Sequence, residues 1–241
     1  MIFKGFCYLA IENIGVKGAV YMCDNIGSSE MNCELKVVNM SEEAFNDALF
    51  FSKKIAETEN LFEQYRYKRA SLVFFCVSAE ARLNSLILEN LKKIVLITSL
   101  KEKDKEELET WLGMLTNEKE NEVPKGYSTI VLRLNRFLLK SINMRAVRKN
   151  DEQIPEFEKY VKLSNVRNAV AHYSYRNFKQ AYKEIDMWIN DAPDIIQNLF
   201  SKYYELVEDN ELYYTKDVTG NKQSLDEFLK WFIKREPWVI E

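Results

Sequence analysis

Hydrophobic and polar positions follow two different patterns along the chain, and the change comes near residue 40. Before it, apolar residues occur in short runs rich in β-branched and aromatic side chains, which are typical of strands. Turn signals containing glycine and asparagine separate the runs, which span residues 6–11, 19–23 and 33–38. They predict a three-stranded antiparallel meander within residues 1–40. We expect it to pack against the rest of the chain, because so small a sheet is marginally stable alone.

From Ser41 onward, apolar residues recur with helical spacing. Ser41 is a candidate N-cap, and the acids Glu42 and Glu43 behind it would complement the helix dipole. The predicted helices span roughly residues 41–65, 68–97, 101–122, 128–147, 157–173, 178–190, 194–207 and 224–234. The 68–97 helix is apolar on nearly every face in its first half, so we expect it to be the central buried helix. The sequence thus predicts a mainly α-helical bundle over residues 41–241, with the β meander as an appendage.

Composition favours a soluble protein. The chain has 241 residues, of which 46% are hydrophobic and 29% charged, as in ordinary globular proteins. The most apolar run, residues 72–97, is interrupted by charged side chains that a bilayer would not accept cheaply. The net charge of -3 gives no global attraction to nucleic acid, so any basic surface has to be local. We expect a cytoplasmic protein that does not enter a membrane.

The cysteine and histidine content limits metal chemistry. The four cysteines, Cys7, Cys23, Cys33 and Cys76, form no CxxC pair, and the N-terminal residues do not read as a secretory signal, so reduced thiols are expected. A zinc site made from the first three remains an open alternative. The single histidine, His172, excludes a two-histidine metal helix and a three-histidine zinc centre. No metal or cofactor is predicted.

His172 is therefore the one imidazole available for proton transfer near neutral pH, and Arg167 precedes it by five residues. Such a pair suits a phosphate diester, where charge builds on phosphorus oxygens while a proton moves. If Ser164 caps a helix, Arg167 lies in its first turn, where the dipole opposes a cation unless an anion binds there. Asn168 and His172 share a helix face, but Arg167 and His172 do not. A second copy of the helix across a two-fold axis would build a common groove and supply both an acid and a base.

Arg167-Asn168-(three residues)-His172 resembles the Arg-X₄₋₆-His signature of the HEPN superfamily, and residues 79–87 resemble an early HEPN helix in which Glu is followed by Asn. The resemblance covers roughly residues 42–207. It implies a helical bundle that dimerises and a metal-independent endoribonuclease at the dimer interface. Toxin–antitoxin, abortive-infection or antiviral defence is the implied setting, with an antitoxin or regulatory protein as partner.

One position departs from part of that family. Some HEPN toxins carry a tyrosine two positions after the histidine, which a partner enzyme modifies, whereas this chain has Ser174 there. The resemblance therefore does not extend to that mode of regulation. In the implied site, His172 moves the proton, Arg167 stabilises the phosphorane charge, and Asn168 orients His172 or holds a phosphate oxygen. Tyr173 and Tyr175 are predicted to contact bases.

Glu80 is a carboxylate within an apolar stretch, so it needs a partner. We expect Arg167 to be that partner, which would place Glu80 in support of the site. The alternative is a purely structural ion pair with Arg69, Arg82 or another helix.

Residues 125–149 contain seven lysines and arginines and no acid. Arg133, Arg136 and Lys140 recur at helical spacing, and we predict that they form a stripe that follows an RNA backbone. The alternative is that they pair with the abundant acids of residues 102–122.

The leading hypothesis is a homodimeric, metal-independent endoribonuclease acting on single-stranded RNA. The alternative is a non-catalytic HEPN-like bundle that binds RNA or another protein, in which Arg167 and His172 serve packing. A third hypothesis is that the β meander recognises the RNA and that the bundle serves only to dimerise the protein.

Overall fold

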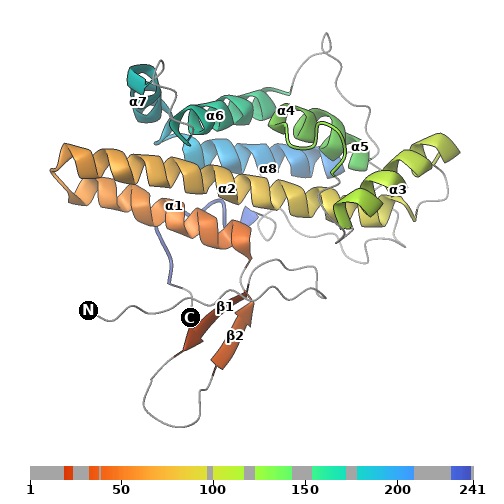
Figure 1. Ribbon diagram of the computed structural model, residues 1–241, viewed down its shortest axis with the longest axis horizontal. Coiled ribbons are helices and arrows are strands. Elements are labelled where there is room, and N and C mark those ends of the chain that lie inside the picture. The colour runs from red at the N-terminus through yellow and green to blue at the C-terminus, as the bar shows by residue number, and fades with distance from the viewer. Residues whose placement is uncertain are drawn as a thin grey trace.

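The computed structural model describes residues 19–23, 33–37, 39–96, 100–116, 123–142, 154–171, 178–208 and 229–239, with backbone alone for 19–23, 33–37 and 178–182. The protein is mainly helical, as predicted (Figure 1). Its centre is the long helix α2, Leu61–Ile94. In Figure 1, α1 lies along one side of α2, and α6 and α8 lie along the other.

α1 (Met40–Glu57) and α2 form an antiparallel hairpin joined by Thr58–Asn60. The single helix predicted for residues 41–65 is therefore wrong. Asn60 ends the connection by accepting hydrogen bonds from the backbone N–H groups of Phe62 and Glu63. An asparagine that satisfies free N–H groups starts a new helix efficiently.

Ser41 does not cap α1. Asn39 is the N-cap, and its side chain accepts from the Ser41 backbone N–H at 3.0 Å. The Ser41 hydroxyl instead donates to the Ser78 carbonyl at 2.9 Å, and the Ser78 hydroxyl donates back to the Ser41 carbonyl at 2.6 Å. These reciprocal bonds satisfy buried hydroxyl groups and hold α1 close to the middle of α2.

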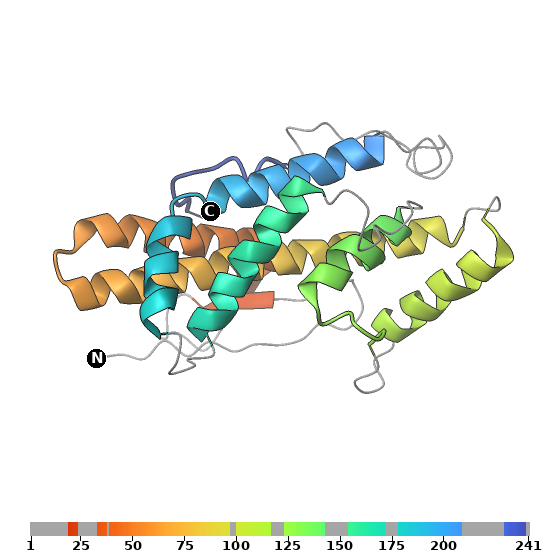
Figure 2. The same ribbon diagram turned by 90° about the horizontal axis from the view of Figure 1, so that it is seen from above.

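The remaining helices cover the other faces of α2 (Figure 2). They are α3 (Glu102–Thr116), α4 (Ile130–Leu132), the π-helix η1 (Arg133–Leu138), α5 (Leu139–Ser141), α6 (Pro155–Ala171), α7 (Phe178–Trp188) and α8 (Ala192–Glu208). The break between α7 and α8 falls where the sequence predicts it.

The core gathers around α2, as the apolar pattern predicts. Leu72, Phe75, Leu83, Ile87 and Leu91 are all fully buried. By length and composition α2 could cross a membrane, but 50% of its apolar window is buried inside the bundle, and core helices of soluble proteins meet the same criterion. The fold is consistent with a soluble protein.

Two strands are described before α1. β1 (Ala19–Cys23) pairs antiparallel with β2 (Cys33–Val37), with Ala19 opposite Val37. The predicted strand at residues 6–11 lies outside the described residues, as do Cys7 and the connections between the runs. The three-stranded meander, its packing on the bundle and the boundary at residue 40 stay predictions.

The C-terminal segment 229–239 packs against α1. The Asn46 amide donates to the Trp238 carbonyl at 2.8 Å, and the Trp238 N–H donates to Asn46 Oδ1 at 2.7 Å. Phe45 contacts both Phe232 and Trp238 with its ring. Of the helix predicted for residues 224–234, the structure describes residues 229–234, which form a turn after Leu229.

Phe45→Ala is expected to lower the free energy of unfolding by about 3–5 kcal/mol, the usual cost of removing a buried phenylalanine from a core. Phe45 is fully buried and its ring contacts Phe75, Phe232 and Trp238. Urea unfolding followed by circular dichroism measures the loss. The control is Phe50→Ala on the same helix, where the side chain is 47% exposed and the expected loss is below about 1 kcal/mol. Equal losses for the two variants would contradict this packing.

Candidate functional site

Arg167 and Asn168 lie on α6, and Ser164 does not start that helix. α6 runs unbroken from Pro155 to Ala171, and Ser164 is buried in its middle. The predicted cap at Ser164, and with it the phosphate site at a helix N-terminus beside Arg167, is wrong. Arg167 lies in the second half of α6, before its last turn, so neither end of the helix dipole acts strongly on its charge.

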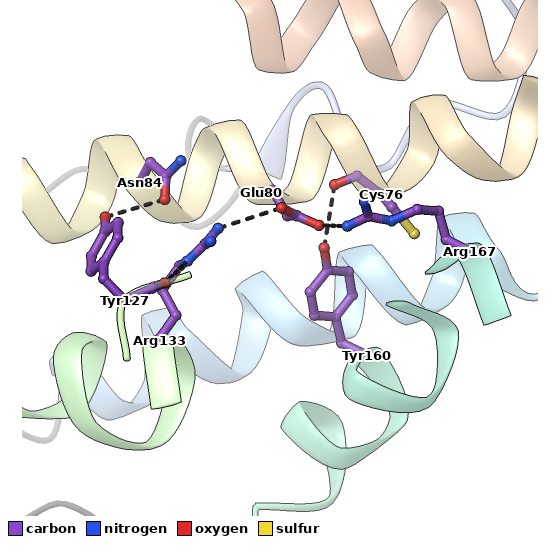
Figure 3. A network of polar contacts seen from close by, with 7 residues as sticks. All are labelled: Cys76, Glu80, Asn84, Tyr127, Arg133, Tyr160 and Arg167. Atoms are coloured by element: carbon purple, nitrogen blue, oxygen red, sulfur yellow. Dashed lines mark hydrogen bonds and ion pairs between the residues drawn. The ribbon is translucent and has the colours of Figure 1, made fainter. Parts of the chain in front are cut away.

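Glu80 on α2 joins two arginines (Figure 3). Its Oε1 accepts a hydrogen bond from Nη2 of Arg167, and its Oε2 pairs with Nη1 of Arg133 at 3.5 Å. The pairing with Arg167 confirms the partner predicted for Glu80. One carboxylate between two guanidinium groups leaves a surplus of one positive charge. The side chains of Glu80 and Arg167 are 25% and 21% exposed, so that charge is only partly shielded by water.

Arg133 is more deeply buried, with 9% of its side chain exposed. Its Nε donates to the Tyr127 carbonyl at 3.0 Å, and its guanidinium group lies over the Tyr127 ring at 5.1 Å. The Tyr127 hydroxyl in turn donates to Asn84 on α2 at 3.2 Å (Figure 3). Arg133 begins the π-helix, a rare conformation that is frequent at functional sites. These contacts fix Arg133 against α2.

Two further buried groups lie beside the network, Cys76 and Tyr160. The Tyr160 hydroxyl donates to the Cys76 carbonyl at 3.3 Å. Burial raises the pKa of Tyr160 well above its usual value. Burial also raises the pKa of the Cys76 thiol to about 12, although the neighbouring Arg167 acts in the opposite direction. Both groups therefore stay protonated at neutral pH and serve neither as nucleophile nor as base.

Cys76 is expected to resist thiol reagents in the folded protein. With a thiol pKa of about 12, roughly one molecule in ten thousand carries the thiolate at pH 8, and the thiolate is the reactive form. The test is labelling with a chromogenic disulfide reagent in a variant whose other three cysteines are serine. We expect no labelling before unfolding and complete labelling in guanidinium chloride. Fast labelling of the native protein would contradict the burial of Cys76.

Two residues of the predicted basic stripe form ion pairs with acids of α3. Nη2 of Arg136 lies 3.0 Å from Glu107, and Nζ of Lys140 lies 2.6 Å from Asp104, both on α3. Lys140 accordingly holds the pKa of Asp104 below its usual value. Arg133 is buried and does not belong to an exposed stripe. The alternative, pairing with the acids of residues 102–122, thus holds for Arg136 and Lys140, and their binding to RNA stays a prediction.

The structure brings Arg167, Glu80 and Arg133 together and places Asn168, which is half-buried, directly after Arg167 on α6. His172, Tyr173 and Tyr175 lie outside the described residues, where the chain continues from the end of α6. Sequence reasoning placed Arg133 on an exposed stripe and missed its link to Glu80. No local sequence signal indicates that link, because the two residues are 53 positions apart and lie on different helices.

The network fixes the positively charged guanidinium group of Arg167, which precedes the chain's one histidine, His172, by five residues. Within the described residues, no group of three histidine, cysteine or acidic side chains is placed to hold a metal ion. The described surroundings of Arg167 supply positive charge and hold its side chain against α2. No family model, curated protein or solved structure matches the chain.

Proposed function

We propose that this chain is a metal-independent endoribonuclease of HEPN type that acts as a homodimer. The observation that carries the proposal is the pairing of Arg167 with Glu80 and of Glu80 with Arg133. One arginine is enough to neutralise one carboxylate. Here the second arginine leaves the network positive, so Arg167 keeps charge and hydrogen-bonding capacity for an anionic ligand.

In the proposed reaction, the 2′-hydroxyl oxygen of one nucleotide attacks the adjacent phosphorus atom. The new O2′–P bond forms and the P–O5′ bond breaks, which leaves a 2′,3′-cyclic phosphate and a 5′-hydroxyl. One histidine takes the 2′-hydroxyl proton and another donates a proton to O5′. Each chain has a single histidine, so the two roles fall to His172 of each of two protomers.

Arg167 would stabilise the negative charge that builds on the phosphorane oxygens, as preorganised cations do in such reactions. Asn168 would orient His172 or hold a phosphate oxygen. Growth control or defence, with an antitoxin or another regulatory protein that restrains the enzyme, fits the resemblance to HEPN proteins and is part of this proposal.

The experiment that tests the proposal uses RNA with one modified nucleotide. Wild-type protein is incubated with single-stranded RNA and transfer RNA in EDTA, and the cleavage sites are mapped. The same RNA is then made with a 2′-deoxynucleotide at one mapped site. We expect cleavage to disappear at that site and to continue at the others. Continued cleavage at the deoxynucleotide would contradict attack by the 2′-hydroxyl.

A second function, a non-catalytic bundle that binds another protein, is favoured by one observation. Arg136 and Lys140, which were predicted to follow an RNA backbone, already pair with Glu107 and Asp104. A surface neutralised in this way attracts RNA weakly. The absence of RNA cleavage by a folded dimer, with and without cellular extract as a source of activator, would favour this second function.

A further inference from the structure

We infer that Arg133 is a positioning residue of the site: it acts through Glu80 to keep Arg167 available to the RNA phosphate. This inference rests on the ribonuclease function proposed above. The network that carries it is Arg133–Glu80–Arg167 (Figure 3).

The two arginines take different oxygens of the same carboxylate. Arg167 binds Oε1 of Glu80 through Nη2, and Arg133 binds Oε2 through Nη1. Arginine and carboxylate otherwise tend to form two parallel hydrogen bonds, which use both oxygens. Because Arg133 occupies Oε2, Arg167 binds Glu80 through Nη2 alone. Nε of Arg167 is buried and its side chain also contacts Cys76, so the Nη atoms are the ones that would meet a phosphate oxygen.

The net charge of Arg133, Glu80 and Arg167 also supports a positioning role for Arg133. With Arg133 present, the three side chains carry a surplus of one positive charge. Without it, Glu80 and Arg167 would form a neutral pair, and the attraction to a phosphodiester would fall. Because the side chains of Glu80 and Arg167 are about three-quarters buried or more, with 25% and 21% exposed, solvent screens this change only in part.

Arg133 is poorly placed to touch RNA itself. Its side chain is 9% exposed, Nε is used by the Tyr127 carbonyl, and the guanidinium group stacks on the Tyr127 ring. Arg136, three residues on in the same π-helix, is 46% exposed and pairs with Glu107 on α3. The two arginines therefore form a matched pair in which one joins the Glu80 network and the other does not.

The test compares Arg133→Gln with Arg136→Gln, which remove the same charge from the same segment. kcat and KM for RNA cleavage are measured in EDTA, together with the thermal unfolding midpoint of each variant. We expect Arg133→Gln to lower kcat about tenfold, the lower end of the loss seen when a residue that orients a metal ligand is removed. Arg136→Gln should leave kcat within about twofold of the wild type, because any contact of Arg136 with RNA would appear in KM.

Glu80→Gln supplies the second half of the test, because Arg133 is argued to act through Glu80. In the Glu80→Gln background, adding Arg133→Gln should cost less than about twofold more, since groups that act through a common partner are not additive. Arg133→Lys keeps the charge and should keep most of the activity. If Arg133→Gln does not fold, the lysine variant decides: retained activity supports the inference, and a folded but inactive variant overturns it.

Three results would overturn the inference: equal effects of Arg133→Gln and Arg136→Gln on kcat, effects of Arg133→Gln and Glu80→Gln on kcat that multiply, or a kcat loss that follows the unfolding midpoint alone. In each of these cases wild-type cleavage remains, so the ribonuclease function stands. A wild-type protein that does not cleave RNA instead overturns the proposed function, and the role of Arg133 falls with it.

Discussion

Arg167→Ala is expected to lower kcat for RNA cleavage in EDTA by about 10²–10³-fold, the usual cost of removing a group that stabilises transition-state charge. The fold itself should survive, because Glu80 keeps Arg133 as a partner and is not left as an unpaired carboxylate. We therefore expect a much larger loss of activity than of stability. Single-turnover cleavage rates, measured beside urea unfolding, separate the two effects.

Lys162→Ala is the matched control for Arg167→Ala. Lys162 lies on the same helix, is exposed, and has no part in the Glu80 network. We expect it to leave kcat within about twofold of the wild type, as for most surface substitutions. Arg167→Lys should fall between wild type and Arg167→Ala, because lysine keeps the charge but offers a single point of attachment. Equal cleavage rates for Arg167→Ala and Lys162→Ala would show that Arg167 has no role in catalysis.

His172→Ala is expected to have an effect at least as large, because it removes the only imidazole in the chain. General acid–base catalysis contributes about 10²–10⁴-fold, and in a composite site the substitution removes the acid and the base together. The unfolding midpoint should not change. RNA cleavage by the purified variant, with thermal unfolding followed by circular dichroism, measures both.

Mixing the two proteins tests whether the site is shared between protomers. Wild type and His172→Ala are unfolded together in equal amounts and refolded, so that about half of the dimers are mixed by random pairing. If both histidines are needed, activity falls to about a quarter of the wild-type value at equal total protein, because only wild-type pairs remain active. Half of the activity would show that each protomer works alone.

The helices could be predicted because burial imposes a 3.6-residue period on their apolar positions, a period that is clear in α1, α7 and α8 and weaker in α2, which is apolar on several faces. The break at Thr58–Asn60 was missed although the sequence contains its signal. Asn60 is followed three residues later by Glu63, and Asn39 by Glu42, in both cases the pattern of a helix start. In each helix the asparagine side chain accepts from the backbone N–H two residues on.

Part of the candidate site could also be predicted. A carboxylate inside an apolar helix requires a partner, which is why Glu80 could be linked to Arg167 before its position was known. Arg133 could not be placed, because its spacing from Arg136 and Lys140 does not say which of the three side chains packs against α2. The helix cap predicted at Ser164 was wrong because a serine occurs both at helix caps and in tightly packed helix interiors. The local sequence does not distinguish the two.

The most direct test of the ribonuclease proposal is the chemical identity of the RNA ends. Wild type and His172→Ala are incubated with the same RNA in EDTA, and the products are analysed by mass spectrometry. The proposal predicts a 2′,3′-cyclic phosphate and a 5′-hydroxyl from the wild type and no product from His172→Ala. Products with a 3′-hydroxyl and a 5′-phosphate, or equal cleavage by the two proteins, would contradict it.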